Sequence, residues 1–170
     1  MKKKNIHLLT QAAMIAALYV VLTFIANAFG LANYSVQVRF SEALTILPFF
    51  TPAAIPGLFI GCLISNILTG CAIPDIIFGS IATLIGALGT WKLSGSKNVF
   101  PKNIFPAPLP PILANTIIVP FVLRYAYGIR PLWLSFLTVG AGEIISCGIL
   151  GLLLAFTLNK YRSQIFRESF

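Results

Sequence analysis

Long apolar runs separated by short polar breaks dominate this sequence, and they fall at about residues 8–29, 40–51, 54–71, 75–92, 109–126 and 131–159. A helix that crosses a bilayer needs about 20 predominantly apolar residues. Charged residues make up only 9% of the chain and the mean hydropathy is +0.91, whereas about a quarter of the residues of a soluble domain are charged. The sequence therefore predicts an all-α integral membrane protein, with residues 1–170 forming one transmembrane domain of six membrane-spanning helices.

The positions of the basic residues predict the orientation of these helices. Six spans place nine of the twelve Lys and Arg residues on the side of both termini and three on the opposite side, at Arg39, Arg124 and Arg130. Cytoplasmic loops carry the excess of basic residues. We therefore expect a multi-pass protein of the cell membrane with both termini in the cytoplasm, and the loops at 30–41, 71–75 and 124–130 outside.

Composition and missing motifs exclude several classes of function. The formal net charge is +8, but the basic residues lie between apolar runs and do not form the basic face that binds nucleic acid. The one histidine, His7, lies beside the cytoplasmic tail, so no metal cluster and no Ser-His pair is expected in the spans. The phosphate-loop pattern G-x-x-x-x-G-K-[ST] does not occur. We expect no enzyme, no cofactor, no metal and no nucleic-acid partner, and a transporter of this kind would take its energy from an ion gradient or a partner.

Polar and ionisable residues inside the apolar runs are the strongest indication of function. A charge at bilayer depth costs about 2.5–3.5 kcal/mol on insertion scales, so such residues mark functional sites by default. The expected topology places several of them at the outer face or deeper, where they would line a pocket entered from outside. These candidate residues are Arg39, Glu42, Asn66, Asp75, Asn115 and Glu143.

Structural alternatives remain open for most of these residues. Arg39 and Glu42, three positions apart, could form an ion pair at a helix start, and an acid such as Asp75 after Pro74 is an ordinary helix-initiation signal. Asparagines in spans can join helices by hydrogen bonds. Glu143 has no such explanation, because no basic residue lies within four positions of it.

Aromatic and small residues complete the pattern. Tyr34, Tyr127 and Trp133 lie near the expected outer interface, where they could form an aromatic belt or stack on a planar ligand. Small residues at four-residue spacing allow close helix contact, either within the bundle or with another protein. Physical reasoning alone favours internal packing for these, which are Ala12, Ala13, Ala16 and Ala17 in the first run and Gly57 and Gly61 in the third.

Four strings of sequence resemble the QueT-type queuosine-precursor transporters. They are VRFSEALTILPFF from Val38, NILTG from Asn66, the pair Pro74-Asp75, and IATLIGALGT from Ile81. These transporters are substrate-binding S components of energy-coupling factor (ECF) transporters. The resemblance implies a six-helix S-component bundle that captures its substrate outside the cell, together with a membrane coupling protein and two cytoplasmic ATPases. It also implies that Ala12, Ala13, Ala16 and Ala17 face the coupling protein, and this replaces the preference for internal packing.

The ligand that the resemblance implies is a 7-deazaguanine such as 7-aminomethyl-7-deazaguanine. Its guanine-like edge presents N–H donors to a carboxylate, its O6 needs a donor, and its ammonium needs a second carboxylate. We expect Glu143 or Glu42 to bind the guanine edge and Asp75 or the remaining glutamate to bind the ammonium. Arg39, Asn66 and Asn115 would supply donors or hold the acids in place.

Other classes of function remain possible on the sequence alone. A membrane scaffold or assembly protein would use the polar residues only to join helices and would bind no small molecule. An S component for another small vitamin-like solute would keep the architecture and change the cargo. A self-sufficient ion-coupled carrier usually has inverted repeats, and none is evident in this sequence.

Overall fold

The computed structural model describes residues 3–30, 38–94, 104–161 and 165. This part of the chain is helical throughout and has no strand. In chain order its elements are α1 (Lys3–Ala28), η1 (Phe40–Phe49), α2 (Ala54–Leu68), α3 (Ile73–Leu93), α4 (Leu109–Ala126), α5 (Leu132–Glu143), η2 (Ile144–Leu150) and α6 (Gly151–Lys160).

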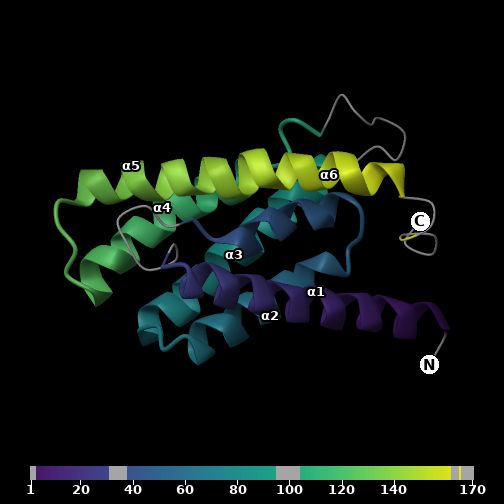
Figure 1. Cartoon of the computed structure of the whole chain (residues 1–170), viewed down its shortest axis with the longest axis horizontal. Coiled ribbons are helices and arrows are strands. Elements are labelled where there is room, and N and C mark those ends of the chain that lie inside the picture. Colours follow the sequence, from purple (N-terminus) through teal and green to yellow (C-terminus); the bar gives the residue numbers. More distant parts are fainter. Residues whose placement is uncertain (1–2, 31–37, 95–103, 162–164, 166–170) are drawn as a thin grey trace.

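The helices run along the length of one bundle. α5, the π-helix η2 and α6 follow one another without a break and form a single long rod, which lies along one side of the bundle in Figure 1 with α1 along the other. The start of α1 and the end of α6 lie at the same end of the bundle (Figure 1). The two ends of a chain lie on the same side of a membrane when the chain crosses it an even number of times, and this arrangement fits that condition.

All six apolar runs of the sequence are helical, which confirms the all-helical class. Four helices have the length and composition to cross a membrane: Asn5–Ala28, Ile73–Leu93, Leu109–Ala126 and Leu132–Lys160. Phe40–Phe49 and Ala54–Leu68 are apolar but shorter. Six complete crossings therefore remain a prediction, as does the single-domain boundary at 1–170.

The short element η1 lies inside the bundle. It is a 3₁₀-helix in which every residue from Ser41 to Pro48 is buried, and it packs against α1, α3, α6 and η2. Its Ile46 joins Tyr19 of α1 and Leu58 of α2 in the main apolar core. At about 2.0 Å rise per residue, ten residues extend about 20 Å, which is less than the hydrocarbon thickness of about 30 Å. The helices that surround η1 thus fix the positions of its side chains inside the bundle.

Glycines allow two pairs of helices to approach closely. A Cβ on Gly57 would lie 2.7 Å from the carbonyl oxygen of Ala12, and one on Gly61 would lie 3.0 Å from that of Ala16. α1 therefore packs directly on α2. In the same way, a Cβ on Gly86 of α3 would lie 2.6 Å from Cα of Pro111 in α4. These two contacts hold the four helices that surround the polar interior.

Candidate functional site

Glu42 lies at the centre of a buried polar cluster. Its side chain is 2% exposed, although η1 is otherwise apolar or weakly polar. The hydroxyl of Tyr19 in α1 donates a hydrogen bond to Oε1, and Nδ2 of Asn115 in α4 donates to Oε2 at 3.4 Å. Tyr19 and Asn115 lie near the middle of their helices. The cluster therefore lies deep in the bundle.

Glu143 brings a second carboxylate to the same place. It is the last residue of α5 and is 6% exposed. The thiol of Cys147, one turn later, donates to Oε2 of Glu143 at 3.1 Å and approaches the backbone carbonyl of Glu42 at 3.4 Å. π-Helical turns are rare and occur frequently at functional sites, and η2 begins directly after Glu143. Tight packing of η2 on η1 thus unites the two acids.

The donors that the structure gives these carboxylates are neutral: a phenol, an amide and a thiol. Ligand atoms of Glu42, Glu143 and Cys147 lie within 4.8 Å of one another, which is close enough for a metal ion. Hard cations such as Ca²⁺ and Mg²⁺ take six or more oxygen ligands, whereas both oxygens of Glu42 already accept hydrogen bonds. An organic cation with its own N–H donors suits the pair better, so the absence of a metal stays our prediction.

A second polar group lies where α3 begins and α4 ends. Asp75 is 4% exposed, and its Oδ2 accepts a hydrogen bond of 3.2 Å from the Tyr127 hydroxyl, which itself accepts one from the Ala72 amide. Oδ1 of Asp75 has no hydrogen-bond partner among the described residues. Burial, reinforced by the Asp75 carboxylate, raises the pKa of Tyr127 to about 12. The phenol therefore stays protonated at neutral pH and donates to Asp75.

A line of polar side chains connects the two groups. Nδ2 of Asn66 contacts Sγ of Cys62 at 3.6 Å, and the Thr83 hydroxyl donates to the same sulfur at 3.5 Å. Thr83 also interacts with Glu42. Asp75 and Thr83 are eight residues apart on α3 and so share one helix face, separated by about 12 Å along the axis. Polar side chains thus lie along α3 from Asp75 to the level of Glu42.

Arg39 lies at the start of η1 and is attracted electrostatically to Asp75 and Glu42. Its largest attraction is to Asp75, while the Glu42 oxygens accept hydrogen bonds from Tyr19 and Asn115. Among the described residues, Arg39 and Glu42 therefore do not form the local ion pair that was one alternative. Arg39 is thus attracted to an acid of each polar group.

The structure thus brings together six of the eight expected ligand-binding residues: Arg39, Glu42, Asn66, Asp75, Asn115 and Glu143. Trp133 does not join them, because it lies one residue into α5 with 64% of its surface exposed. Tyr34 lies outside the described residues. Sequence reasoning missed Tyr19, Thr83 and Cys147. The four-residue spacing of Cys147 from Glu143 could have indicated it, but nothing local to the sequence marks Tyr19.

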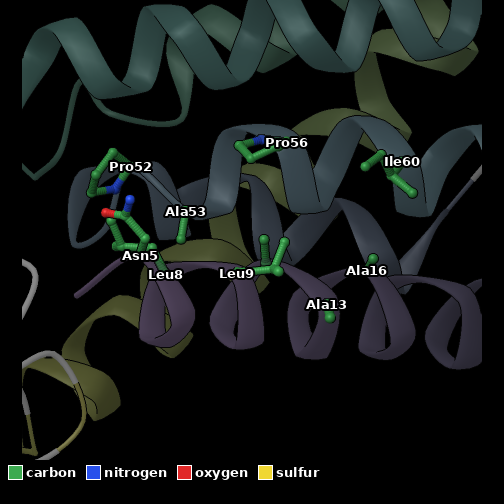
Figure 2. Close-up of a pocket in the computed structure, with 10 residues that line it drawn as sticks. Asn5, Leu8, Leu9, Ala13, Ala16, Pro52, Ala53, Pro56 and Ile60 are labelled. Carbon is green, nitrogen blue, oxygen red and sulfur yellow. The ribbon is translucent and has the colours of Figure 1, made fainter. Parts of the chain in front are cut away.

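The small residues of α1 are divided between two environments. Ala12 and Ala16 contact the glycines of α2, whereas Ala13 and Ala17 are exposed. Beside this contact lies an apolar groove of about 550 Å³ (Figure 2), lined by Asn5, Leu8, Leu9, Ala12, Ala13, Ala16, Pro52, Ala53, Pro56 and Ile60. The groove belongs to the half of α1 nearest the N-terminus, away from Tyr19.

Apolar helices long enough to span a bilayer, closed around buried carboxylates, define a multi-pass membrane protein with an internal polar site. Comparison with known sequences then gives the family. Residues 9–160 match the QueT transporter family, so the chain belongs to that family and the resemblance found in the sequence is confirmed.

One relative is the queuosine precursor transporter QueT of Lactococcus lactis subsp. cremoris (strain MG1363). It is 36% identical over 85 residues, which cover 50% of this chain and 50% of the relative. The matched region thus spans about half the length of that protein. No solved structure matches the chain.

Proposed function

We propose that this protein is the substrate-binding S component of an ECF transporter and captures a queuosine precursor outside the cell. The observation that carries the proposal is the pair of buried carboxylates, Glu42 and Glu143, whose hydrogen-bond donors are neutral side chains. Buried charges are normally paired or coordinate a metal. Arg39 is attracted to these acids but most strongly to Asp75, so a cationic ligand would compensate the charge that remains on Glu42 and Glu143. The family membership and the name of the Lactococcus relative support this class of cargo.

A 7-deazaguanine such as 7-aminomethyl-7-deazaguanine matches the chemistry of the interior. Its ammonium complements carboxylates, and its planar ring offers donors on one edge beside an oxygen acceptor. The described interior supplies both kinds of group: carboxylate oxygens on Glu42, Asp75 and Glu143, and amide donors on Asn66 and Asn115. Charge-assisted hydrogen bonds are about twice as strong as neutral ones, so the acids would contribute most of the affinity.

The proposed topology opens the site to the outside of the cell membrane. The excess of basic residues beside the termini supports a cytoplasmic location for both ends of the chain. Asp75 then lies nearer the outer face, with Glu42 about 12 Å deeper. The polar line from Asp75 to Glu42 would receive the ligand from outside.

The proposed partners are an ECF coupling protein and two cytoplasmic ATPases. The groove between α1 and α2 supports a partner of this kind, because on this topology it opens at the cytoplasmic half of the bundle and its lining is almost wholly apolar. Ala13 and Ala16 leave space for a partner helix, as small residues do in membrane interfaces. Ala12, packed inward, would shape the groove, and Ala17 would extend the exposed stripe.

Binding of the purified protein to a panel of ligands tests the cargo. We expect calorimetry on the detergent-solubilised chain, without partners, to show tight binding of 7-aminomethyl-7-deazaguanine and none of riboflavin, thiamine or biotin. Guanine is expected to bind at least ten-fold more weakly, because it lacks the cation that Glu42 and Glu143 would compensate. Folded protein that binds none of these ligands would contradict the proposal and favour the scaffold function, whereas binding of another vitamin alone would favour an S component for that solute.

Filling the groove tests the partners. We expect Ala13→Leu to reduce uptake of the precursor at least five-fold in cells that express the coupling protein and ATPases, because the larger side chain occupies the apolar groove. Ligand binding by the purified variant should not change, since Ala13 is exposed and distant from Glu42. Ala141→Leu, an exposed alanine on α5, is the matched control and should transport normally. Normal uptake by Ala13→Leu would argue against this docking surface.

A further inference from the structure

Asp75 carries an acceptor atom that the described protein leaves unused. The Tyr127 hydroxyl satisfies Oδ2, whereas Oδ1 is buried and has no hydrogen-bond partner among the described residues. An unsatisfied buried polar atom costs about 1–3 kcal/mol, and more when the group is charged. Arg39 is attracted to Asp75, but no hydrogen bond from the described residues reaches Oδ1. A side chain that is 4% exposed therefore leaves this atom to a donor from another source.

A donor lies beside this acceptor. A Cβ built on Gly79 would lie 3.2 Å from Oδ1 of Asp75 and 3.3 Å from Nδ2 of Asn66. The two atoms are therefore no farther apart than the sum of these distances, about 6.5 Å, and they converge where glycine leaves space. The contact that Asn66 Nδ2 makes in the described structure is a long one of 3.6 Å to the sulfur of Cys62, a weak acceptor. An amide N–H is thus available.

One acceptor and one donor side by side complement a lactam edge, in which an N–H lies next to a C=O. An ammonium fits this place poorly, because it offers only donors and would put its charge against the Asn66 N–H groups. Glu42 and Glu143 have the opposite character, since two acids lie together and receive only neutral donors.

We propose that Asp75 and Asn66, over the bare backbone of Gly79, recognise the lactam edge of the ligand, and that Glu42 and Glu143 hold its cationic substituent. The sequence analysis assigned the ring edge to Glu143 or Glu42 and the ammonium to Asp75 or the remaining glutamate. The present assignment moves the ring edge to Asp75, and it rests on the proposed function. Oδ1 of Asp75 would accept from the ring N–H, while Nδ2 of Asn66 would donate to the neighbouring carbonyl oxygen. The separation of about 12 Å between Asp75 and Thr83 along α3, with Thr83 interacting with Glu42, leaves a bicyclic ring between the two ends.

Two ligands that differ only at this edge test the assignment. 7-Aminomethyl-7-deazaguanine carries the N–H/C=O edge, and 7-aminomethyl-7-deazaadenine carries a ring acceptor beside an amine in its place. We expect Asp75→Asn to lower the affinity for the guanine form at least ten-fold and to lower the ratio of guanine to adenine affinities by the same factor. Glu143→Gln should weaken both ligands equally. A site built to hydrogen-bond one edge rejects its analogue strongly.

Two further variants, one at Gly79 and one at Ser80, complete the experiment. Gly79→Ala is expected to weaken the guanine form at least ten-fold, because the new methyl group would occupy the space between the two polar atoms. Ser80→Ala is the matched control: its buried hydroxyl donates only to the carbonyl of Ile76 in its own helix, at 2.7 Å, so affinity should not change. Equal losses for both ligands in Asp75→Asn, or unchanged binding in Asp75→Asn and Gly79→Ala, would overturn the assignment. Failure of the unmodified protein to bind 7-aminomethyl-7-deazaguanine would instead refute the proposed function itself.

Discussion

Glu42→Gln is expected to lower the affinity for 7-aminomethyl-7-deazaguanine about a hundredfold. Removing one member of a buried charge pair costs about 2–5 kcal/mol, and each 1.4 kcal/mol is a factor of ten. The isosteric amide also offers one acceptor in place of two, so it cannot accept from both the Tyr19 hydroxyl and the Asn115 amide. Calorimetric titration of the purified variant measures the loss.

Thr90→Val separates loss of binding from loss of structure. The Thr90 hydroxyl is also fully buried, but it donates to the carbonyl of Ala107 at 2.9 Å, away from the acids. This variant should be less stable yet bind the ligand normally. If Glu42→Gln lowers only the unfolding temperature and leaves affinity intact, the carboxylate is structural and the scaffold function gains support.

Gly86→Ala is expected to destabilise the bundle by about 3 kcal/mol, at the upper end of the range for overpacked sites. An added Cβ would lie 2.6 Å from Cα and 2.8 Å from Cβ of Pro111. The nearest atom belongs to the backbone of α4, so the two helices would have to separate. Thermal unfolding in detergent should show a clearly lower midpoint, and the folding equilibrium should shift more than a hundredfold.

Gly148→Ala is the matched control for Gly86→Ala. The nearest atoms to its added Cβ, on Ile112 and Ile144, lie at 3.9 Å, which is ordinary van der Waals contact. Alanine favours a helix over glycine by about 1 kcal/mol, so this variant should be as stable as the unmodified protein or slightly more stable. Equal unfolding midpoints for Gly86→Ala and the unmodified chain would contradict the close packing of α3 on α4.

Most of the fold could be predicted from the sequence because hydropathy fixes where membrane helices lie. The runs at 40–51 and 131–159 correspond closely to η1 and to the rod from Leu132 to Lys160. The first helix begins at Lys3, earlier than expected, since no helix-breaking residue precedes the apolar run. What hydropathy could not predict is the type of each element: a 3₁₀-helix for η1 and a π-helix after Glu143 result from tertiary packing.

The membership of the site was predictable only in part. Charged and amide residues inside apolar runs are conspicuous, so Glu42, Asp75 and Glu143 were identified individually. Which of these acids lie next to one another within the site could not be predicted, because it depends on how η1 packs on η2 and how the turn at Gly70, with φ of +72°, returns α3 beside Asn66. Tyr19 gave no signal, since an aromatic residue in a membrane helix is equally compatible with lipid contact.

The chain contains four acidic residues, and three of them, Glu42, Asp75 and Glu143, are buried; the fourth, Glu168, lies outside the described residues. Long-range steering of a charged solute depends on exposed charge, and salt screens that charge. On the proposed function, the acids would act only after the solute has entered, where bulk ions screen them far less. If the ligand is a cation, as proposed, we expect its affinity to depend on a long residence time rather than on fast arrival.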